Sequence, residues 1–593
     1  MKLLRLKITD PAGFRSLPCG FEFHFQNAWS LHDDLTKSAD FAPFVCAGRN
    51  GSGKSNLLEV LAAIFFQLEI LRVRRSFLPE ALQENIDFAP VGFELDYLIR
   101  VPADYTKPNG EIWAKVNVWK SPGELVRLLW DNQDEFSTDG YEIFEGGHMD
   151  FLLPQYIVGY SSGENEILSL PFFKMRFVQF DEYWQSLWQQ LPYPGRPDTR
   201  LAYLDSGFSQ AILLCNLLFQ DEAILQPFRE DIGIEELKEF RIIIRRSIPI
   251  DTNQLLEFYA EDLSQGKSLN DLVKSHSALT EEIDANENIS YKLNLLHQIQ
   301  GKEDSPTIVS ALKRSATLHY VDEETDTLIL DYWVNDATKK AFRANFDNSP
   351  LALFQALQVL LNLNLYTVTN TLKSELYKSN SHYVSETIPI LASDQRIMRF
   401  KHFYFKKKNV AKPMLLKELS DGEHQLLHSL GLCLLFRNTN SLFLLDEPET
   451  HFNPDWRANF ITRLRQCLTN SKDKSQEMLI TTHTPFLISD SKPDKVLVFN
   501  KDERGKVSIS RPEYNTLGAS INLITMETFD KQETIGEYAK QQLDDLLSDP
   551  SAKTDPHGLV KRIIQTLGDS IERTLAVQSI LAGKSSAPKV EPD

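Results

Sequence analysis

The sequence has no long apolar run and no paired cysteine motif. Its five cysteines are scattered through 593 residues without CxxC spacing, which argues against a zinc ribbon or a disulfide framework and favours buried thiols in a reducing cytosol. No apolar segment approaches the roughly 20 residues that span a bilayer. The first residues, MKLLRLKITDPAG, resemble neither a signal peptide nor an anchor. We therefore expect a cytoplasmic protein that does not contact a membrane.

Positive charge is also scarce. The chain has 63 Lys and Arg residues against 82 Asp and Glu residues, a formal net charge of -19. Such a surface does not attract nucleic acid as a whole, so any contact with DNA must come from local basic patches. The remaining composition, 42% hydrophobic and 24% charged, is that of a globular chain long enough for two to four domains.

A glycine-rich segment, residues 48–55, matches the GxxxxGK[ST] phosphate loop over its full length. It follows the apolar run Phe44–Ala47 and precedes a helical pattern at Asn56–Ile70, which is the strand-loop-helix context of that motif. Backbone amides would surround phosphate oxygens, Lys54 would neutralise phosphate charge and Ser55 would ligate Mg²⁺. The segment predicts a site for ATP and Mg²⁺. The residues expected to contact the nucleotide are Gly48, Asn50, Gly51, Gly53, Lys54, Ser55 and Asn56.

A second segment, Leu419–Pro454, has the chemistry to complete this site. Its turn, Ser420–Gly422, opens a helical pattern, and a helix N-terminus attracts anions. Residues 442–445 are apolar at every position, as expected for a strand buried on both faces of a parallel sheet. Asp446 and Glu447 follow at its carboxyl end, where open α/β sheets place their ligand chemistry. Alone, the two acids could be caps, but the phosphate loop makes an active-site role the better interpretation.

Four short strings carry a resemblance to a known family. GRNGSGKS, LSDGEHQ, LFLLDEP and ITTHTP resemble motifs of the ATP-binding-cassette (ABC) ATPases of the SMC and RecF type. More narrowly, DEPETHFNP and TTHTPFLISD resemble the AAA/OLD-like ATPases of bacterial anti-phage systems, of PtuA type or associated with restriction systems. The resemblance covers about residues 1–160 and 388–515. It implies an α/β fold, with an ABC-type ATPase head of a mixed sheet with helices plus an antiparallel lobe, split by a large, mainly helical insertion.

The resemblance also implies a role for each matching side chain. Asp446 would hold Mg²⁺ through water, and Glu447 would orient and deprotonate the attacking water. With Lys54, His483 would act in catalysis as the switch histidine that senses the γ-phosphate; the alternative is a capping or core histidine. Arg15, in the string FRSL, would approach the nucleotide as in SMC and RecF heads, or is an exposed arginine in a turn.

Ser420 and Gly422 match the family signature, which contacts the γ-phosphate bound by a partner head. The active site would then be shared, so the resemblance implies a homodimer or higher homo-oligomer when ATP is bound. Two positions depart from the family pattern. Asp421 replaces the first glycine of the signature. It either weakens the binding of ATP between the two heads or caps the helix. Asn453 occupies a position where the family usually has an aspartate. The best candidate for the Q-loop residue is Asn165.

The motifs divide the chain into four expected parts. Residues 1–165 form the N-terminal half of the head, 166–387 a mainly helical insertion, 388–515 the C-terminal half of the head, and 516–593 a C-terminal helical segment with a disordered tail. Heptads are not sustained, which argues against a long coiled coil. The helices predicted in the insertion are residues 209–219, 234–246, 253–263, 291–300 and a buried one at 349–365.

Basic and aromatic residues alternate at residues 396–408, a predicted strand. Its lysines and arginines could follow DNA phosphates while an aromatic ring stacks on a base. The alternative, which we favour, is an edge strand protected by lysines. A second basic cluster at residues 72–75 is either a solvated helix end or a face for DNA or a partner. His424 and His428 lie one helical turn apart, but no third ligand is evident, so we predict no zinc site.

The preferred hypothesis is an ATP-hydrolysing head that dimerises on ATP and regulates a separate effector, a nuclease of HNH type, in anti-phage defence within a Septu-like or retron complex. One alternative is a DNA-repair or recombination ATPase of the SMC and RecF type that binds DNA directly; the acidic charge and the missing coiled coil oppose it. Another is a weakly hydrolysing, ATP-responsive scaffold, which Asp421 would suit. No Toprim-like acidic cluster follows His483, which argues against a fused nuclease.

Overall fold

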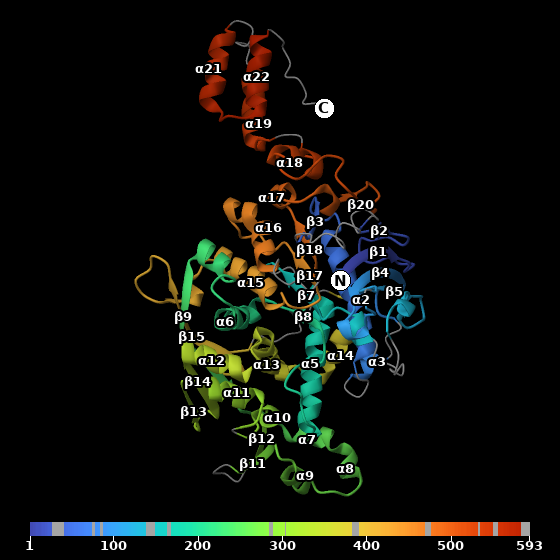
Figure 1. Cartoon of the computed structure of the whole chain (residues 1–593), viewed down its shortest axis with the longest axis vertical. Helices are drawn as coiled ribbons and strands as arrows, with labels where there is room; N and C mark the ends of the chain where they lie inside the picture. Colours follow the sequence, from blue (N-terminus) through green and yellow to red (C-terminus); the bar gives the residue numbers. More distant parts are fainter. Residues whose placement is uncertain are drawn as a thin grey trace.

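The chain folds around a mixed α/β core. The computed structural model describes residues 1–26, 41–73, 78–83, 87–108, 110–137, 149–162, 168–283, 289–302, 304–381, 391–468, 476–531, 534–548 and 555–582. Two helical extensions lie at opposite ends of the molecule, the C-terminal helices at one and helices α7 to α9 of the insertion at the other (Figure 1). Asn165 and the tail from residue 583 lie outside the described residues.

The core contains a seven-stranded sheet of order β20-β19-β3-β18-β17-β7-β8. All neighbouring pairs are parallel except β19 and β20. The strand expected at residues 442–445 is β17, and every one of its residues is buried, because it lies between two parallel neighbours. The strands are β3 (Phe44–Gly48), β7 (Tyr156–Ser161), β8 (Leu201–Tyr203), β17 (Ser441–Asp446), β18 (Glu477–Thr482), β19 (Val496–Lys501) and β20 (Val507–Ser510).

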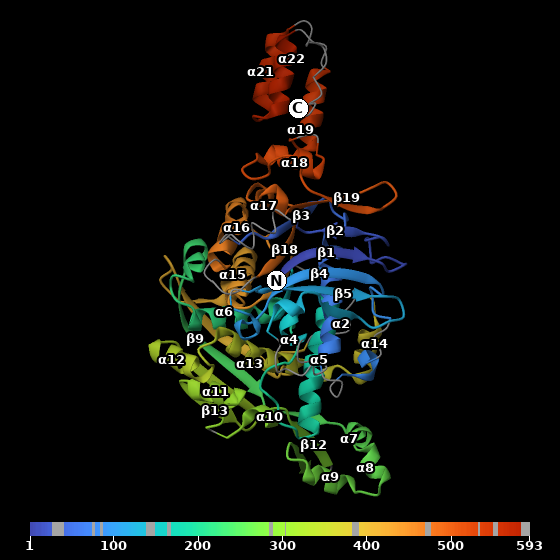
Figure 2. The same cartoon turned by 45° about the vertical axis from the view of Figure 1, so that its right-hand side comes forward.

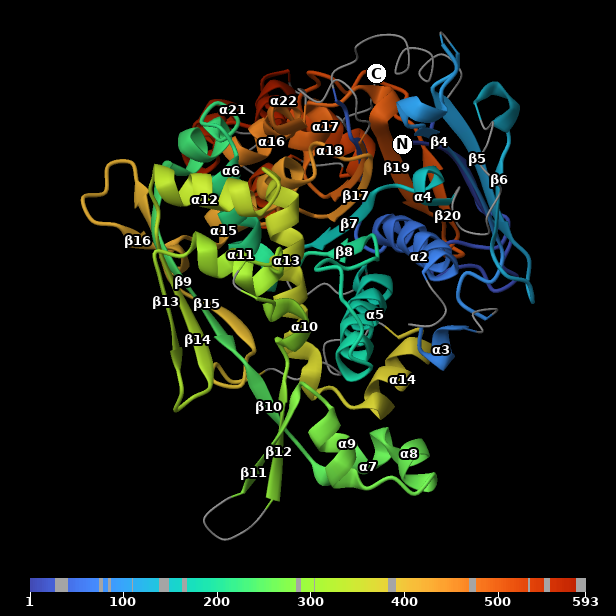
Figure 3. The same cartoon turned by 60° about the horizontal axis from the view of Figure 1, so that its bottom comes forward.

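The predicted antiparallel lobe is a five-stranded sheet of order β2-β1-β4-β5-β6. Helix α2 (Lys54–Arg72) lies between this lobe and the central sheet, and nearly all of its residues are buried (Figure 3). The ring of Phe65 on α2 packs 5.9 Å from Tyr97 of the lobe. Figure 2 shows the lobe beside the central sheet. Its strands are β1 (Lys2–Ile8), β2 (Glu22–His24), β4 (Phe93–Arg100), β5 (Trp113–Lys120) and β6 (Arg127–Trp130).

The insertion contains more strand than the sequence patterns predicted. A five-stranded sheet has the order β13-β14-β9-β15-β16, and a three-stranded one has the order β10-β12-β11. The former joins β9 of the insertion to β15, which follows it by more than 150 residues. The strands are β9 (Ile234–Arg245), β10 (Ser247–Ile250), β11 (Leu279–Ile283), β12 (Ile289–Asn294), β13 (Leu318–Asp322), β14 (Thr327–Trp333), β15 (Met398–Lys407) and β16 (Met414–Leu415).

The helix predicted at residues 234–246 is wrong, because this segment is β9. Its buried residues Ile234, Leu237 and Phe240 are three apart, which imitates a helical period. In the structure the register between β9 and β15 shifts opposite this half of the strand, so the usual alternation of two is lost. The helix predicted at residues 291–300 is also wrong, since most of its first half is β12 and only a short helix, α10, follows.

The other predicted helices of the insertion are confirmed. Residues 209–219 form α6 and residues 253–263 form α7 and α8, while α13 is buried and begins at the expected cap, Ser349. The helices are α5 (Ser169–Trp188), α6 (Ser209–Phe219), α7 (Thr252–Phe258), α8 (Ala260–Ser264), α9 (Leu269–Ser275), α10 (His297–Gln300), α11 (Ile308–Ser315), α12 (Asp336–Asn345), α13 (Pro350–Asn362) and α14 (Asn370–Lys378). Short helices α3 (Glu80–Gln83) and α4 (Met149–Leu152) precede them.

Past the insertion, α15 (Asp421–Leu435), α16 (Pro454–Leu468) and α17 (Pro485–Ser489) alternate with strands β17 and β18 of the central sheet, and α18 (Ile521–Phe529) follows the last strand. The helical segment expected at the C-terminus also contains α19 (Glu537–Leu547), α21 (Pro556–Thr566) and α22 (Ile571–Leu581). These three share a small core of their own, made by Leu543, Leu559, Ile563 and Ala576.

Most of the cysteines are buried. Cys46, Cys215, Cys433 and Cys467 are buried thiols as predicted, whereas Cys19 is exposed. Among the described residues, no single helix has the length and apolarity to cross a membrane; Pro350–Thr367 and Asn370–Lys378 pass that test only as a pair bent by 108°.

Candidate nucleotide site

A cavity of about 600 Å³ opens at the carboxyl ends of β3, β17 and β18. The parallel strands end side by side there, so segments from distant parts of the chain meet. The phosphate loop supplies one wall and the residues after β17 and β18 supply the other. The lining residues are Asn50, Gly51, Ser52, Gly53, Lys54, Ser55, Asn56, Glu447 and His483.

The phosphate loop depends on glycine at its two ends. Gly48 has φ 144°, and a Cβ there would lie 2.5 Å from the carbonyl oxygen of Phe499 on β19. Gly53 has φ 99° and forms the left-handed N-cap of α2, so the first amides of that helix face the loop. This combination of loop amides and a helix N-terminus is suited to phosphate oxygens.

The amine of Lys54 lies over the loop. Its Nζ donates to the carbonyl oxygens of Gly48, at 3.0 Å, and Arg49, at 3.1 Å. Burial lowers the pKa of Lys54, and the acids Glu447 and Asp446 oppose that shift. A phosphate group entering the cavity would give this largely buried cation a charged partner.

Ser55 and Asp446 meet at the floor of the site. The hydroxyl of Ser55 donates to Oδ1 of Asp446 over 2.8 Å, and Thr481 on β18 donates to the same oxygen over 2.5 Å. Asp446 is only 1% exposed, and burial raises the pKa of its carboxyl group. A hydroxyl and a carboxylate oxygen in contact are hard ligands of the kind that Mg²⁺ prefers, so these residues fit the ion.

Glu447 and His483 face each other across the cavity. Nε2 of His483 lies 2.7 Å from Oε1 of Glu447, and this hydrogen bond holds the pKa of the Glu447 carboxyl below its usual value. Glu447 adopts φ 49°, a left-handed conformation that costs about 1 kcal/mol for a residue with a side chain. Its amide donates to Thr481 Oγ1 over 3.0 Å, which holds the strained backbone in place.

Two of the predicted contacts, Arg15 and Asn56, form hydrogen bonds with other residues of the chain. Arg15 pairs with Glu59 on α2 over 2.9 Å and donates to the carbonyl of Asn380, and it lines a different cavity. Asn56 lines the nucleotide cavity but accepts a hydrogen bond from Ser16 over 2.6 Å. A nucleotide role for Arg15 stays a prediction.

The signature residues stand at the N-terminus of α15, apart from the lining of the cavity. Ser420 and Glu423 form a reciprocal capping box, and Asp421 begins the helix. A Cβ on Gly422 would lie 2.7 Å from the carbonyl oxygen of His451, so glycine allows the loop after β17 to approach. Asn453 caps α16 by accepting from the amide of Trp456.

Two residues that the motifs did not single out, Thr481 and Ser52, also lie at the site. Thr481 contacts both Asp446 and Glu447, and it could have been noticed as the first polar residue of TTH after an apolar strand. Ser52 lines the cavity, and its buried hydroxyl has no hydrogen-bond partner among the described residues. An unpaired hydroxyl in a phosphate loop is a further donor for a phosphate oxygen.

His428, one of the two histidines on α15, is occupied by other contacts. Nδ1 of His428 lies 2.6 Å from Ser209 Oγ and Nε2 lies 2.7 Å from the carbonyl of Leu204, which uses both ring nitrogens. Burial lowers its pKa to about 4. Among the described residues, no group of three or more His, Cys, Asp or Glu side chains could hold a metal ion.

Two lysines of the basic strand β15 are paired with acids. Lys406 pairs with Glu235 over 2.9 Å and Lys407 pairs with Glu423 over 2.5 Å, while Phe403 is buried. The strand pairs along its length with β9 and, on its other side, only with the short β16. Arg72 of the other basic cluster is also paired, with Glu69 over 2.7 Å.

A known protein family matches part of the chain. Residues 220–489 match a family described as "AAA domain, putative AbiEii toxin, Type IV TA system". These residues are similar to an AAA ATPase domain. The match covers less than half of the chain; it includes Asp446, Glu447 and His483 and leaves the phosphate loop outside.

No curated protein matches the sequence. One similar solved structure is entitled "Crystal structure of the SmcHead bound to the C-winged helix domain of ScpA". It shares 11% identity over 86% of this chain and 96% of that chain, with a TM-score of 0.30. The α/β fold class therefore rests on the strands and helices themselves, which agree with the expected mixed sheet and antiparallel lobe.

Proposed function

We propose that this protein binds and hydrolyses ATP with Mg²⁺, dimerises on ATP, and regulates a partner nuclease in bacterial anti-phage defence. The observation that supports the ATPase proposal is one cavity. It combines a complete phosphate loop with Asp446 at its floor and the pair Glu447 and His483 at its rim.

The chemistry follows from the positions of these groups. The loop amides and Lys54 would bind the β- and γ-phosphates, and Ser55 and Asp446 would hold the ion, which supplies charge neutralisation when bound. Glu447, kept ionised by His483, would accept a proton from the attacking water. Loss of the γ-phosphate would remove a contact of His483. This residue directly follows β18, so the change at the cavity would reach the end of that strand.

The dimer proposal starts from the position of Ser420 and Gly422 outside the cavity of their own chain. A second copy would present its α15 N-terminus to the bound γ-phosphate, and helix amides with a hydroxyl are suited to that contact. The ion pair between Lys407 and Glu423 would carry the resulting movement into the sheet of β9 and β15.

The effector proposal, an HNH-type nuclease in a Septu-like or retron complex, is supported by the narrower motif resemblance. The description of the matching family names a toxin of a toxin–antitoxin system, which supports a role in which a harmful activity is restrained.

The test of the ATPase site is Glu447→Gln, with Glu324→Gln in the exposed turn between β13 and β14 as the matched control. We expect ATP binding to persist and turnover to fall by at least about 100-fold, because the amide cannot accept the proton. The control should hydrolyse ATP like the wild type. Equal turnover in Glu447→Gln and the control would refute the assignment.

The dimer and effector proposals need a separate measurement. Native mass of the Glu447→Gln protein with and without ATP, and again with Ser420→Ala added, tests the shared site. We expect ATP to double the mass and Ser420→Ala to prevent it. Co-purification of a nuclease from the native host tests the effector, and a monomer that binds ATP alone would leave only the ATPase assignment standing.

A further inference from the structure

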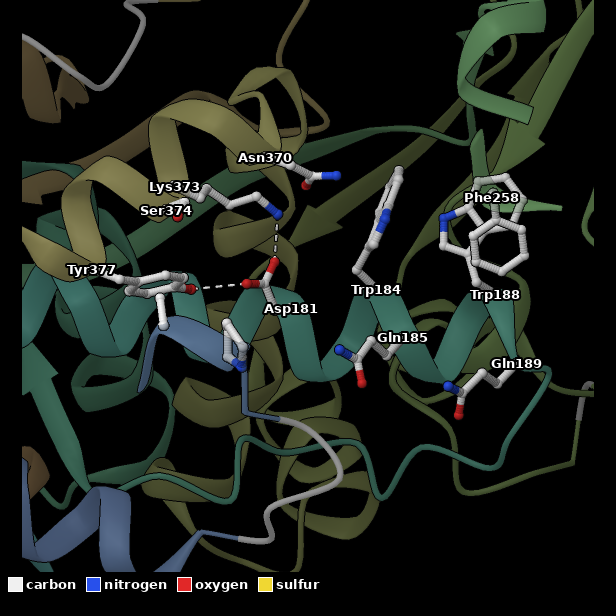
Figure 4. A pocket seen from close by; sticks show the side chains of 12 residues that line it. Asp181, Trp184, Gln185, Trp188, Gln189, Phe258, Asn370, Lys373, Ser374 and Tyr377 are labelled. Atoms are coloured by element: carbon white, nitrogen blue, oxygen red, sulfur yellow. Dashed lines mark hydrogen bonds and ion pairs between the residues drawn. The ribbon is translucent and has the colours of Figure 1, made fainter. Parts of the chain in front are cut away.

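A second cavity, of about 520 Å³, is lined by the C-terminal part of α5 (Figure 4). Helix α5 runs from β7, where Phe172 packs on Gly159, to this cavity in its last two turns. Helix α14 and the end of α7 form the opposite walls. The nucleotide cavity shares none of its lining residues, so this is a separate site.

Aromatic rings form much of the wall. Trp184 and Trp188 lie one turn apart on α5, with ring centroids 5.9 Å apart. Phe258 packs on Trp188 in a tilted arrangement, with ring centroids 4.3 Å apart. Phe180 stacks behind Trp184 at 5.4 Å and fixes its plane. Phe258 is 44% exposed although it is a large apolar side chain. Figure 4 shows the indole of Trp184 standing between Asp181 on one side and the pair Trp188 and Phe258 on the other.

The charged groups of the cavity cancel each other. Lys373 pairs with Oδ1 of Asp181 over 2.5 Å, and Tyr377 donates to Oδ2 over 2.8 Å. Asp181 is 8% and Lys373 6% exposed, so the pair is buried and both charges are satisfied. This wall therefore offers a ligand no free charge. We do not expect it to bind a phosphate group.

Carboxamides supply the free hydrogen-bonding groups. Gln185, Gln189 and Asn370 line the cavity, and their side chains make no hydrogen bond to another described residue. In Figure 4 the amide of Asn370 points toward Trp184. Each carboxamide offers donors and an acceptor side by side, which matches the edge of a nucleobase.

We infer that this cavity binds a nucleobase, stacked on Trp184 and read at its edge by the carboxamides. Proteins hold unpaired bases by stacking them on aromatic side chains and by hydrogen-bonding to their edges. The base can belong to a free nucleoside or to a single strand. The inference does not depend on the ATPase assignment, since none of its residues lies in the nucleotide cavity.

The test is fluorescence anisotropy of a labelled single-stranded oligonucleotide and of an abasic strand of the same length, at one salt concentration. We expect only the base-bearing strand to bind, and Trp184→Ala to weaken it roughly tenfold or more, the usual effect of losing one stacking ring. Trp184→Phe should keep most of the affinity, which separates lost stacking from misfolding. Trp333→Ala is the control, because Trp333 is 66% exposed on β14 and outside this cavity.

Unlabelled nucleosides, which lack the phosphates that the nucleotide site needs, then identify the source of the base. If nucleosides displace the labelled strand, and do so with an affinity that Trp184→Ala lowers, the ligand is a small molecule. If the strand binds but nucleosides do not displace it, the ligand is a nucleic acid. Equal binding of the abasic strand, an unaltered affinity of Trp184→Ala, or no binding of strand or nucleoside would overturn the proposal.

Discussion

Arg49 in the phosphate loop pairs with Asp530, the residue directly after α18, through a 2.5 Å contact between Nη2 and Oδ2. The same guanidinium donates to the carbonyl oxygens of Phe529 and Asp530. Asp530 adopts φ 50° and ends the helix, so Arg49 holds the C-cap of α18. The C-terminal region therefore contacts the loop that would bind phosphate.

Asp530→Asn should loosen this attachment without unfolding the protein. Both partners are exposed, 62% for Arg49 and 78% for Asp530, so the pair contributes at most about 1 kcal/mol. Hydrogen exchange should become faster in α18 and in the phosphate loop, with little change in melting temperature. Glu222→Gln, which removes the exposed pair with Arg229, is the control and should leave both segments unchanged.

Gly159→Ala should destabilise the core between the site and α5. A Cβ at this position would lie 2.5 Å from the ring of Phe172, which is fully buried and cannot move aside. Overpacking of this kind costs about 1–3 kcal/mol, measured by chemical unfolding. Gly568→Ala is the control, since Gly568 lies between α21 and α22, has no left-handed φ and has no atom within 4 Å of the added carbon. Equal stability of the two variants would contradict this packing.

Glu449 should make the stability of the protein depend on pH. It is buried, Oε1 accepts from Thr482, and Oε2 has no hydrogen-bond partner among the described residues. Burial raises the pKa of Glu449 from 4.5 to about 7, so between these values the folded protein holds a proton that the unfolded chain has lost. Stability from this group therefore falls as pH rises, by roughly 3 kcal/mol in total.

The measurement is the difference in unfolding free energy between Glu449→Gln and the wild type as a function of pH. Glutamine keeps the shape and does not titrate, so the variant should gain stability relative to the wild type from pH 4.5 to 7 and then remain level. A difference that is constant over this range would show that Glu449 is not a buried, neutral acid.

Ser420→Ala should weaken the start of α15 even in the absence of nucleotide. The amide of Ser420 donates to Glu423 Oε2 over 2.9 Å, and its hydroxyl accepts from the Glu423 amide. Loss of such a cap costs about 1 kcal/mol. Ser275→Ala, at the exposed end of α9, is the control and should have a smaller effect. Chemical unfolding of the ATP-free protein separates this effect from any role in dimer formation.

Much of the fold could be predicted because its signals are local. The run at residues 442–445 is apolar at every position, and it is the buried strand β17. The phosphate loop and α2 follow from glycines, Lys54 and an apolar helix pattern that need no distant contact. Strand β9 could not be predicted in this way, because its spacing of buried residues depends on shifts in its pairing with β15.

The sequence by itself determined the types of residue at the nucleotide site, since phosphate and Mg²⁺ chemistry needs Lys54, Ser55, Asp446 and Glu447 in recognisable motifs. Only the tertiary structure decided which groups meet. In the fold Thr481 forms a hydrogen bond with Asp446, Arg15 forms an ion pair with Glu59, and Arg49 forms an ion pair with Asp530. The fold also assembled the aromatic cavity from α5, α7 and α14. The physical reason is that these contacts join residues far apart in the chain, and their partners are chosen by packing and burial rather than by any local pattern.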